Sequence, residues 1–229
     1  MLKFTPILLA VVYAFVMYRF SVWRTHRSLD MQSTELADPR LKALTDRLAA
    51  ALGVARIPVY VYEIDPVNGL AAPDGRIFIT RGFYRKYQNG EVTGEELTSV
   101  IAHELGHVAL GHARKRMIDF SGQNALRTAL ALVLGRFIPF VGVWIANLVT
   151  MMLAAGLSRS DEYEADEYAA ALLTKAGIGT DPQKTLFSKL EDLTQARAGV
   201  APAWLMSHPK TDDRIAALEK LETRWNSVT

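Results

Sequence analysis

The sequence has 229 residues, half of them hydrophobic, with 26 basic and 24 acidic residues and a formal net charge of +2. This length predicts one domain with room for an appended segment, and the balanced, interspersed charges argue against nucleic acid as a partner. Because the chain has no cysteine, disulfides, thiolate metal sites and a cysteine nucleophile are excluded. Any metal ion must therefore be held by His, Asp or Glu.

The N-terminal segment, MLKFTPILLAVVYAFVMYRF, carries no charge from Phe4 to Tyr18. It reaches the roughly 20 apolar residues that cross a bilayer if Arg19 extends to the headgroups, with aromatic residues such as Trp23 at the interface. A cleaved signal peptide is the alternative, but the bulky and charged YRFSVWR that follows favours an uncleaved anchor. We therefore expect a transmembrane anchor over residues 1–28, and the arginines after it favour a cytoplasmic catalytic part.

The next segments predict a helix and then a small sheet. Leucines recur at a helical period from Leu41 to Leu52, which indicates a core helix. IPVYVYE and GRIFIT alternate as strands do, and the DPVNGLAAPDG between them is rich in turn residues. These features predict a small antiparallel sheet. Thr93 and Glu96 then match a capping box, which starts a helix expected to run to about Arg116.

The second half of the chain is expected to be helical. Residues 125–157 are mostly apolar and are interrupted near Arg136 and Pro139. SRSDEYEADEYAAALLTKAG predicts a helix that ends at Gly177, because glycine commonly follows the last turn. Another helix is expected from about Pro182 onward, and a last helix after the turn MSHPKTDDR.

The stretch VIAHELGHVALGH contains the H-E-x-x-H pattern of zinc peptidases. His103 and His107 lie four positions apart, so both imidazoles project from one helix face and can reach one ion. Glu104 lies about 100° round the helix, close enough to address a water on that ion. The alternative is a structural helix whose buried histidines are satisfied by neighbouring groups.

A catalytic zinc site needs a third protein ligand and an open position. His112, nine residues after His103, is expected to point to the opposite face of the helix, so we interpret it as a surface or structural histidine. Glu162 and Asp166 share a face of the later helix, and Glu162 is the natural third ligand. Asp166 would accept a hydrogen bond from a ligand imidazole. The alternative is a solvated acidic helix start, favoured by the helix dipole.

HELGH, SRSDEYEAD and SHPKTDDRIAAL together resemble the gluzincin family of HtpX and the CAAX prenyl proteases. The likeness covers roughly Pro58 to Leu221. It implies an α+β, mainly helical, zincin-like metallopeptidase fold with a small antiparallel sheet and an N-terminal membrane helix. In that family the glutamate of E-x-x-A-D, which falls on Glu162, is the third zinc ligand, and the aspartate falls on Asp166.

The resemblance implies further roles. The strand in NGLAAPDGRIFIT would pair with an extended substrate, although from the residues alone this strand is structural. His208 would stabilise the oxyanion or lie near the metal, and Arg214 would do the same or clamp the fold. Larger members place membrane spans before the third ligand, but a single crossing here would separate Glu162 from the histidines. Residues 125–157 are therefore expected to form a hairpin, within the membrane or its interface or against another subunit; a buried soluble hairpin is the alternative.

These inferences predict a zinc metallopeptidase domain over residues 29–229 with one Zn²⁺ per chain. Glu104 would act as the general base in peptide-bond hydrolysis. By resemblance, the enzyme would sit in the bacterial inner membrane, contact lipid, and cleave misfolded or membrane proteins, with oligomers possible through the hairpin. The alternative function is a latent protease, or a non-proteolytic metal-binding membrane scaffold.

Overall fold

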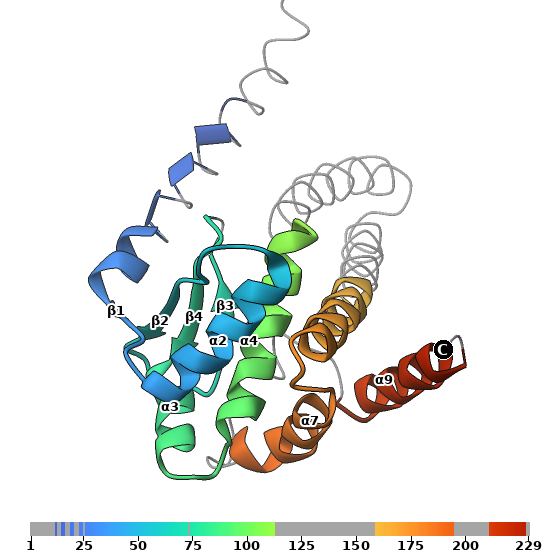
Figure 1. The fold of residues 1–229 in the computed structure, drawn as a ribbon. Helices are drawn as coiled ribbons and strands as arrows, with labels where there is room; N and C mark the ends of the chain where they lie inside the picture. Colours follow the sequence, from blue (N-terminus) through green and yellow to red (C-terminus); the bar gives the residue numbers. More distant parts are fainter. Residues whose placement is uncertain are drawn as a thin grey trace, which may run out of the picture. The chain divides into compact units, whose positions relative to one another are not determined.

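The expected hairpin over residues 125–157, His208 and most of the expected anchor lie outside the residues that the structure describes. The chain divides into two compact units, Met1–Ser33 and Thr34–Thr229, and each is described by itself. The structure is a computed structural model, shown in Figure 1, and it describes isolated positions between residues 12 and 24 and then residues 26–72, 74–112, 159–194 and 211–227.

In the first unit, residues 26–31 are helical. The Arg27 guanidinium lies 5.4 Å from the centre of the Trp23 ring. Phe20 and Trp23, two aromatic residues of the expected membrane interface, have ring centres 5.8 Å apart and are both about half exposed. Within the described part of the chain, no helix combines the length and the apolar content needed to cross a bilayer. The transmembrane anchor remains a prediction.

Apart from Ser33 at the start of β1, the second unit contains a sheet of four strands in the order β1-β2-β4-β3. The expectation of an antiparallel sheet is wrong, because β2 and β4 pair in parallel, although β3 and β4 pair antiparallel. After β2 the chain first forms β3 at the outer edge of the sheet and then turns back to form β4 between β2 and β3. This turn makes β4 antiparallel to β3 and parallel to β2. All four residues of β4 are buried, as expected for a strand covered on both faces. The strands are β1 (Ser33–Glu35), β2 (Val59–Tyr62), β3 (Gly69–Ala71) and β4 (Ile77–Thr80).

The helices begin and end where local signals place them. Asp38 caps the first helix of this unit, which buries Leu41, Leu44 and Leu48 as predicted, whereas Leu52 at its end is exposed. The capping box of Thr93 and Glu96 is confirmed. The described helices are α2 (Pro39–Leu52), α3 (Arg81–Gln88), α4 (Gly94–Ala109), the helix of residues 159–175, α7 (Asp181–Thr194) and α9 (Thr211–Asn226).

One helix is shorter than expected. α4 ends at Ala109 rather than near Arg116, because Gly111 takes the left-handed conformation (φ 68°) and its N–H donates to the carbonyl of Val108. α4 contacts α2, α7, β3 and β4, and it lies between the sheet and the helix of residues 159–175 (Figure 1). The buried side chains of Leu97 and Ile101 place this helix in the hydrophobic core.

Candidate metal centre

The H-E-x-x-H residues lie on the last two turns of α4. Its first turn is fixed by reciprocal bonds: the Thr93 N–H donates to Glu96 Oε2 (2.8 Å) and the Glu96 N–H donates to Thr93 Oγ1 (3.1 Å). The helical period then places the His103 and His107 rings edge to face, with Nε2 atoms 3.1 Å apart. Both side chains are almost fully buried. Two imidazole nitrogens therefore converge on one point inside the protein.

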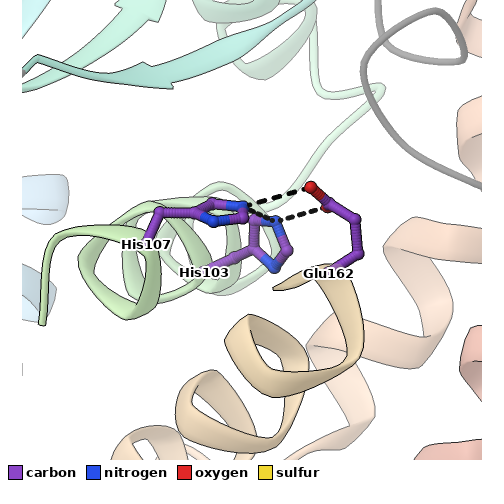
Figure 2. A group of neighbouring side chains, drawn as sticks. All are labelled: His103, His107 and Glu162. Carbon is purple, nitrogen blue, oxygen red and sulfur yellow. Dashed lines mark hydrogen bonds and ion pairs between the residues drawn. The ribbon is translucent and has the colours of Figure 1, made fainter. Parts of the chain in front are cut away.

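Glu162 brings a carboxylate to the same point from the helix of residues 159–175 (Figure 2). Its oxygens lie 3.3 Å from His103 Nε2 and 3.4 Å from His107 Nε2, and the side chain is fully buried. Zinc bonds of about 2.0–2.2 Å in a tetrahedron place ligand atoms about 3.3–3.6 Å apart. The two Nε2 atoms lie 3.1 Å apart, and a different carboxylate oxygen approaches each of them, Oε2 for His103 and Oε1 for His107, at separations close to that spacing. The donor set, two imidazoles and one carboxylate, is also one that zinc accepts.

Gly106, inside the motif, lets the two ligand-bearing helices approach closely. A Cβ on this glycine would lie 3.0 Å from the Cα and the carbonyl oxygen of Ala165. Any larger residue must therefore push the backbone of the opposite helix away. Because Glu162 precedes Ala165 by one helical turn, this close approach sets how near its carboxylate lies to the imidazoles.

A buried ion pair supports His103 from the side away from Glu162. Asp166 Oδ1 lies 2.9 Å from His103 Nδ1. The Arg214 guanidinium, on α9, donates to both oxygens of Asp166 at 2.6 Å, and Gln183 Nε2 donates to Oδ1 at 3.3 Å. Gln183 was not predicted as a site residue, because it lies in none of the sequence motifs. Asp166 thus accepts from three side chains, and it joins α9 to the helix that carries Glu162.

The electrostatics follow from this arrangement. Burial lowers the pKa of His103, but hydrogen bonds to Asp166 and Glu162 outweigh it and raise the pKa to about 9 in the metal-free protein. Burial raises the pKa of Asp166, but the charge of Arg214 and the bonds from Arg214 and His103 hold it below its ordinary value. Asp166 is therefore anionic at neutral pH and favours a proton on His103 Nδ1. With that proton in place, His103 Nε2 is the atom left to bind a metal ion.

Glu104 lies next to the histidines and beside the edge of the sheet. Its side chain is 3% exposed. A Cβ built on Gly69, the first residue of β3, would lie 3.3 Å from Glu104 Oε1. β3 is the last strand in the order β1-β2-β4-β3. The predicted general base thus follows a converging histidine directly in sequence and lies against a strand at the sheet edge.

His112 is buried, so the interpretation as a surface histidine is wrong. It is 1% exposed, and its Nδ1 lies 2.8 Å from His107 Nδ1. His112 does not lie on the opposite face of α4 because α4 ends before it. Gly111, directly before His112, was the signal that the helix stops. Asp161, which the sequence analysis also missed, is buried with its Oδ1 3.9 Å from His112 Nε2. Glu164 is half exposed, as expected for a solvated residue.

Comparisons with known proteins support the same chemistry. The family model of peptidase family M48 matches residues 35–222. Metalloprotease LoiP of Escherichia coli is 31% identical over 175 residues, which cover 76% of this chain and 66% of LoiP. A protease HtpX homolog of Acidiphilium cryptum is 31% identical over 61% of this chain and 53% of its own length. The human mitochondrial metalloendopeptidase OMA1 is 25% identical over 74% of this chain and 33% of its own.

The chain thus spans slightly less than two thirds of LoiP and smaller shares of the other two relatives. The match to the family model nevertheless includes the H-E-x-x-H helix, Glu162, Asp166 and Arg214. M48 peptidases depend on zinc, and three buried side chains of this chain form a site that fits this ion. The chain belongs to peptidase family M48, a family of zinc metallopeptidases.

Proposed function

We propose that this protein is a zinc-dependent endopeptidase in which His103, His107 and Glu162 hold the metal and Glu104 is the general base. One observation carries the proposal. Nitrogen and oxygen atoms of three buried residues, from segments far apart in the sequence, all lie within 4.8 Å of one another. Burying two imidazoles and a carboxylate so close together is costly without a cation to bind them.

The residues around the centre suggest how hydrolysis proceeds. A bound zinc ion would supply a Lewis acid that activates a water and polarises the scissile carbonyl. Glu104 would take the proton of the attacking water and pass it to the leaving amine. Arg214 approaches His103 on its Nδ1 side, behind the ligand atom, and binds Asp166. We therefore assign Arg214 to clamping the site, and we leave stabilisation of the oxyanion to His208.

The substrate is proposed to be an unfolded or extended polypeptide. β3 lies at the sheet edge with Glu104 against its first residue, and an extended peptide that pairs with such a strand would pass the metal. We also propose a membrane-associated enzyme that acts on misfolded or membrane proteins. The charge-free N-terminal segment and the similarity to an HtpX homolog support this location.

The test compares zinc content and cleavage of an unfolded casein substrate, for the full chain in lipid-like detergent. Glu104→Gln should keep about one zinc per chain and lose at least about 100-fold in turnover, because only the base is removed. His103→Ala should lose the metal. Glu95→Gln is the matched control, since Glu95 lies on the first turn of the same helix and pairs with Arg40 at the surface.

The outcomes separate the proposed roles. Wild-type cleavage by Glu104→Gln would show that the base is wrongly assigned. Zinc binding without cleavage by the wild-type chain in any lipid or detergent would favour the metal-binding scaffold. Activity that appears only with lipid would identify a latent protease.

A further inference from the structure

The Nδ1 atoms of the two imidazoles, which point away from the metal centre, contact different partners. Asp166 contacts Nδ1 of His103 directly. The corresponding nitrogen of His107 faces another histidine, His112, at 2.8 Å, and the ring centres are 5.0 Å apart. The proposed mechanism gives His112 no role. A buried histidine that contacts a metal-binding imidazole therefore calls for a physical explanation.

The turn after α4 creates this contact. α4 ends at Ala109 with Leu110 as its C-cap, and Gly111 then reverses the backbone with a φ of 68°, a conformation that costs a residue with a side chain about 1 kcal/mol or more. A continued helix would have carried residue 112 round to the face away from His103. The turn instead places the His112 ring against His107, where it is 1% exposed.

A contact between two Nδ1 atoms requires one proton between them. In the first arrangement His107 donates from Nδ1 and His112 accepts, which leaves His107 Nε2 with a lone pair toward His103 and Glu162. In the second arrangement His112 donates, and a neutral His107 then carries its proton on Nε2, where it blocks a metal ion. Only the first arrangement is compatible with metal binding.

The surroundings of His112 favour the first arrangement. When His112 accepts at Nδ1, its own proton is on Nε2. That nitrogen is buried and faces two carboxylates, Asp161 Oδ1 at 3.9 Å and Glu164 Oε2 at 3.5 Å. Negative charge stabilises an N–H at this position and disfavours a bare lone pair. The acidic residues beside Glu162 thus bias the tautomer of a histidine on the opposite segment.

We propose that His112 is a positioning residue that accepts a hydrogen bond from His107 Nδ1 and so keeps His107 Nε2 ready to bind the metal. This role rests on the proposed function of His107 as a zinc ligand. It also gives the two imidazoles equivalent support, because each would donate its Nδ1 proton to an acceptor outside the centre. The acceptor for His103 comes from the helix of residues 159–175, and the acceptor for His107 from the turn after α4.

The experiment measures Zn²⁺ affinity by chelator competition on the full chain in detergent. His112→Phe keeps a ring of similar size but removes the acceptor, and it should weaken zinc binding about 10- to 100-fold. His112→Asn places an amide oxygen near the position of Nδ1 and should restore affinity to within about 3-fold of wild type. Thermal stability without zinc is recorded for both variants, so that a loss of folding is recognised.

A second measurement uses the wild-type protein alone and needs no substitution. Long-range ¹H–¹⁵N spectra of the zinc-free wild-type chain distinguish the two imidazole tautomers, and His107 is expected to carry its proton on Nδ1. A proton on Nε2 of His107, or equal zinc affinity of wild type and His112→Phe, would overturn the proposal. If wild type itself binds no zinc, the proposed function fails instead, so the two failures are distinguishable.

Discussion

Removing Arg214 is expected to destabilise the protein strongly, although the residue lies outside the predicted ligand set. Its side chain is 0% exposed, it donates two hydrogen bonds of 2.6 Å to the nearly buried Asp166, and it lies 4.2 Å from the centre of the Phe187 ring. Arg214→Met keeps an apolar side chain against Phe187 but leaves the Asp166 carboxylate without its main partner. Loss of one member of a buried ion pair costs about 3–5 kcal/mol.

The lower end of this range applies to the zinc-free protein. The pKa of His103 is raised to about 9, so its imidazole is protonated at pH 7 and still balances part of the Asp166 charge. A loss of about 3 kcal/mol corresponds to a fall in Tm of about 6–12 °C for a domain of this size. Melting in EDTA measures the difference, and Arg224→Met, at an exposed position of the same helix, is the matched control.

The double variant Arg214→Met with Asp166→Asn tests whether an unpaired charge is the cause. Since it removes both charges, it should be less destabilised than the sum of the single variants, by about 1 kcal/mol or more. If Arg214→Met melts within about 2 °C of the Arg224→Met control, the buried pair does not stabilise the fold and the reasoning is refuted.

Two further predictions concern α4. Glu96 is buried at the start of α4. Burial raises the pKa of its carboxyl, but hydrogen bonds from Lys189 and Thr93 outweigh burial and hold the pKa below its ordinary value of 4.5. The ionised carboxylate therefore stabilises the fold at neutral pH, and this stabilisation is lost as the pH falls below 4.5. Glu96→Gln should therefore cost about 1–2 kcal/mol in urea unfolding at pH 7 and progressively less below pH 4.5; an equal cost at both pH values would contradict this. Gly106→Ala gains about 1 kcal/mol of helix propensity but overpacks against Ala165 by about 1–3 kcal/mol, and it should weaken zinc binding because Glu162 moves away. Unchanged zinc affinity would show that this close approach does not set the position of Glu162.

The sheet shows where sequence patterns were insufficient. Alternating side chains and turn residues located strands at IPVYVYE and GRIFIT correctly, because these signals act within a few residues. They carried no information on which strand pairs with which. The parallel pairing of Val59 with Ile77 arises because β3, which comes between β2 and β4 in the chain, lies at the outer edge of the sheet.

The sequence alone determined the elements whose causes are local: the capping box at Thr93, the helical spacing of His103 and His107, and the shared face of Glu162 and Asp166. Tertiary structure decided which of these groups meet. Gly106 sets the approach of two helices, Arg214 pairs with Asp166 from a distant segment, and the turn at Gly111 brings His112 behind His107. Hydrogen bonds along a helix link neighbours in sequence and can be predicted from spacing. Contacts between segments depend on packing of the whole core, which no local pattern specifies.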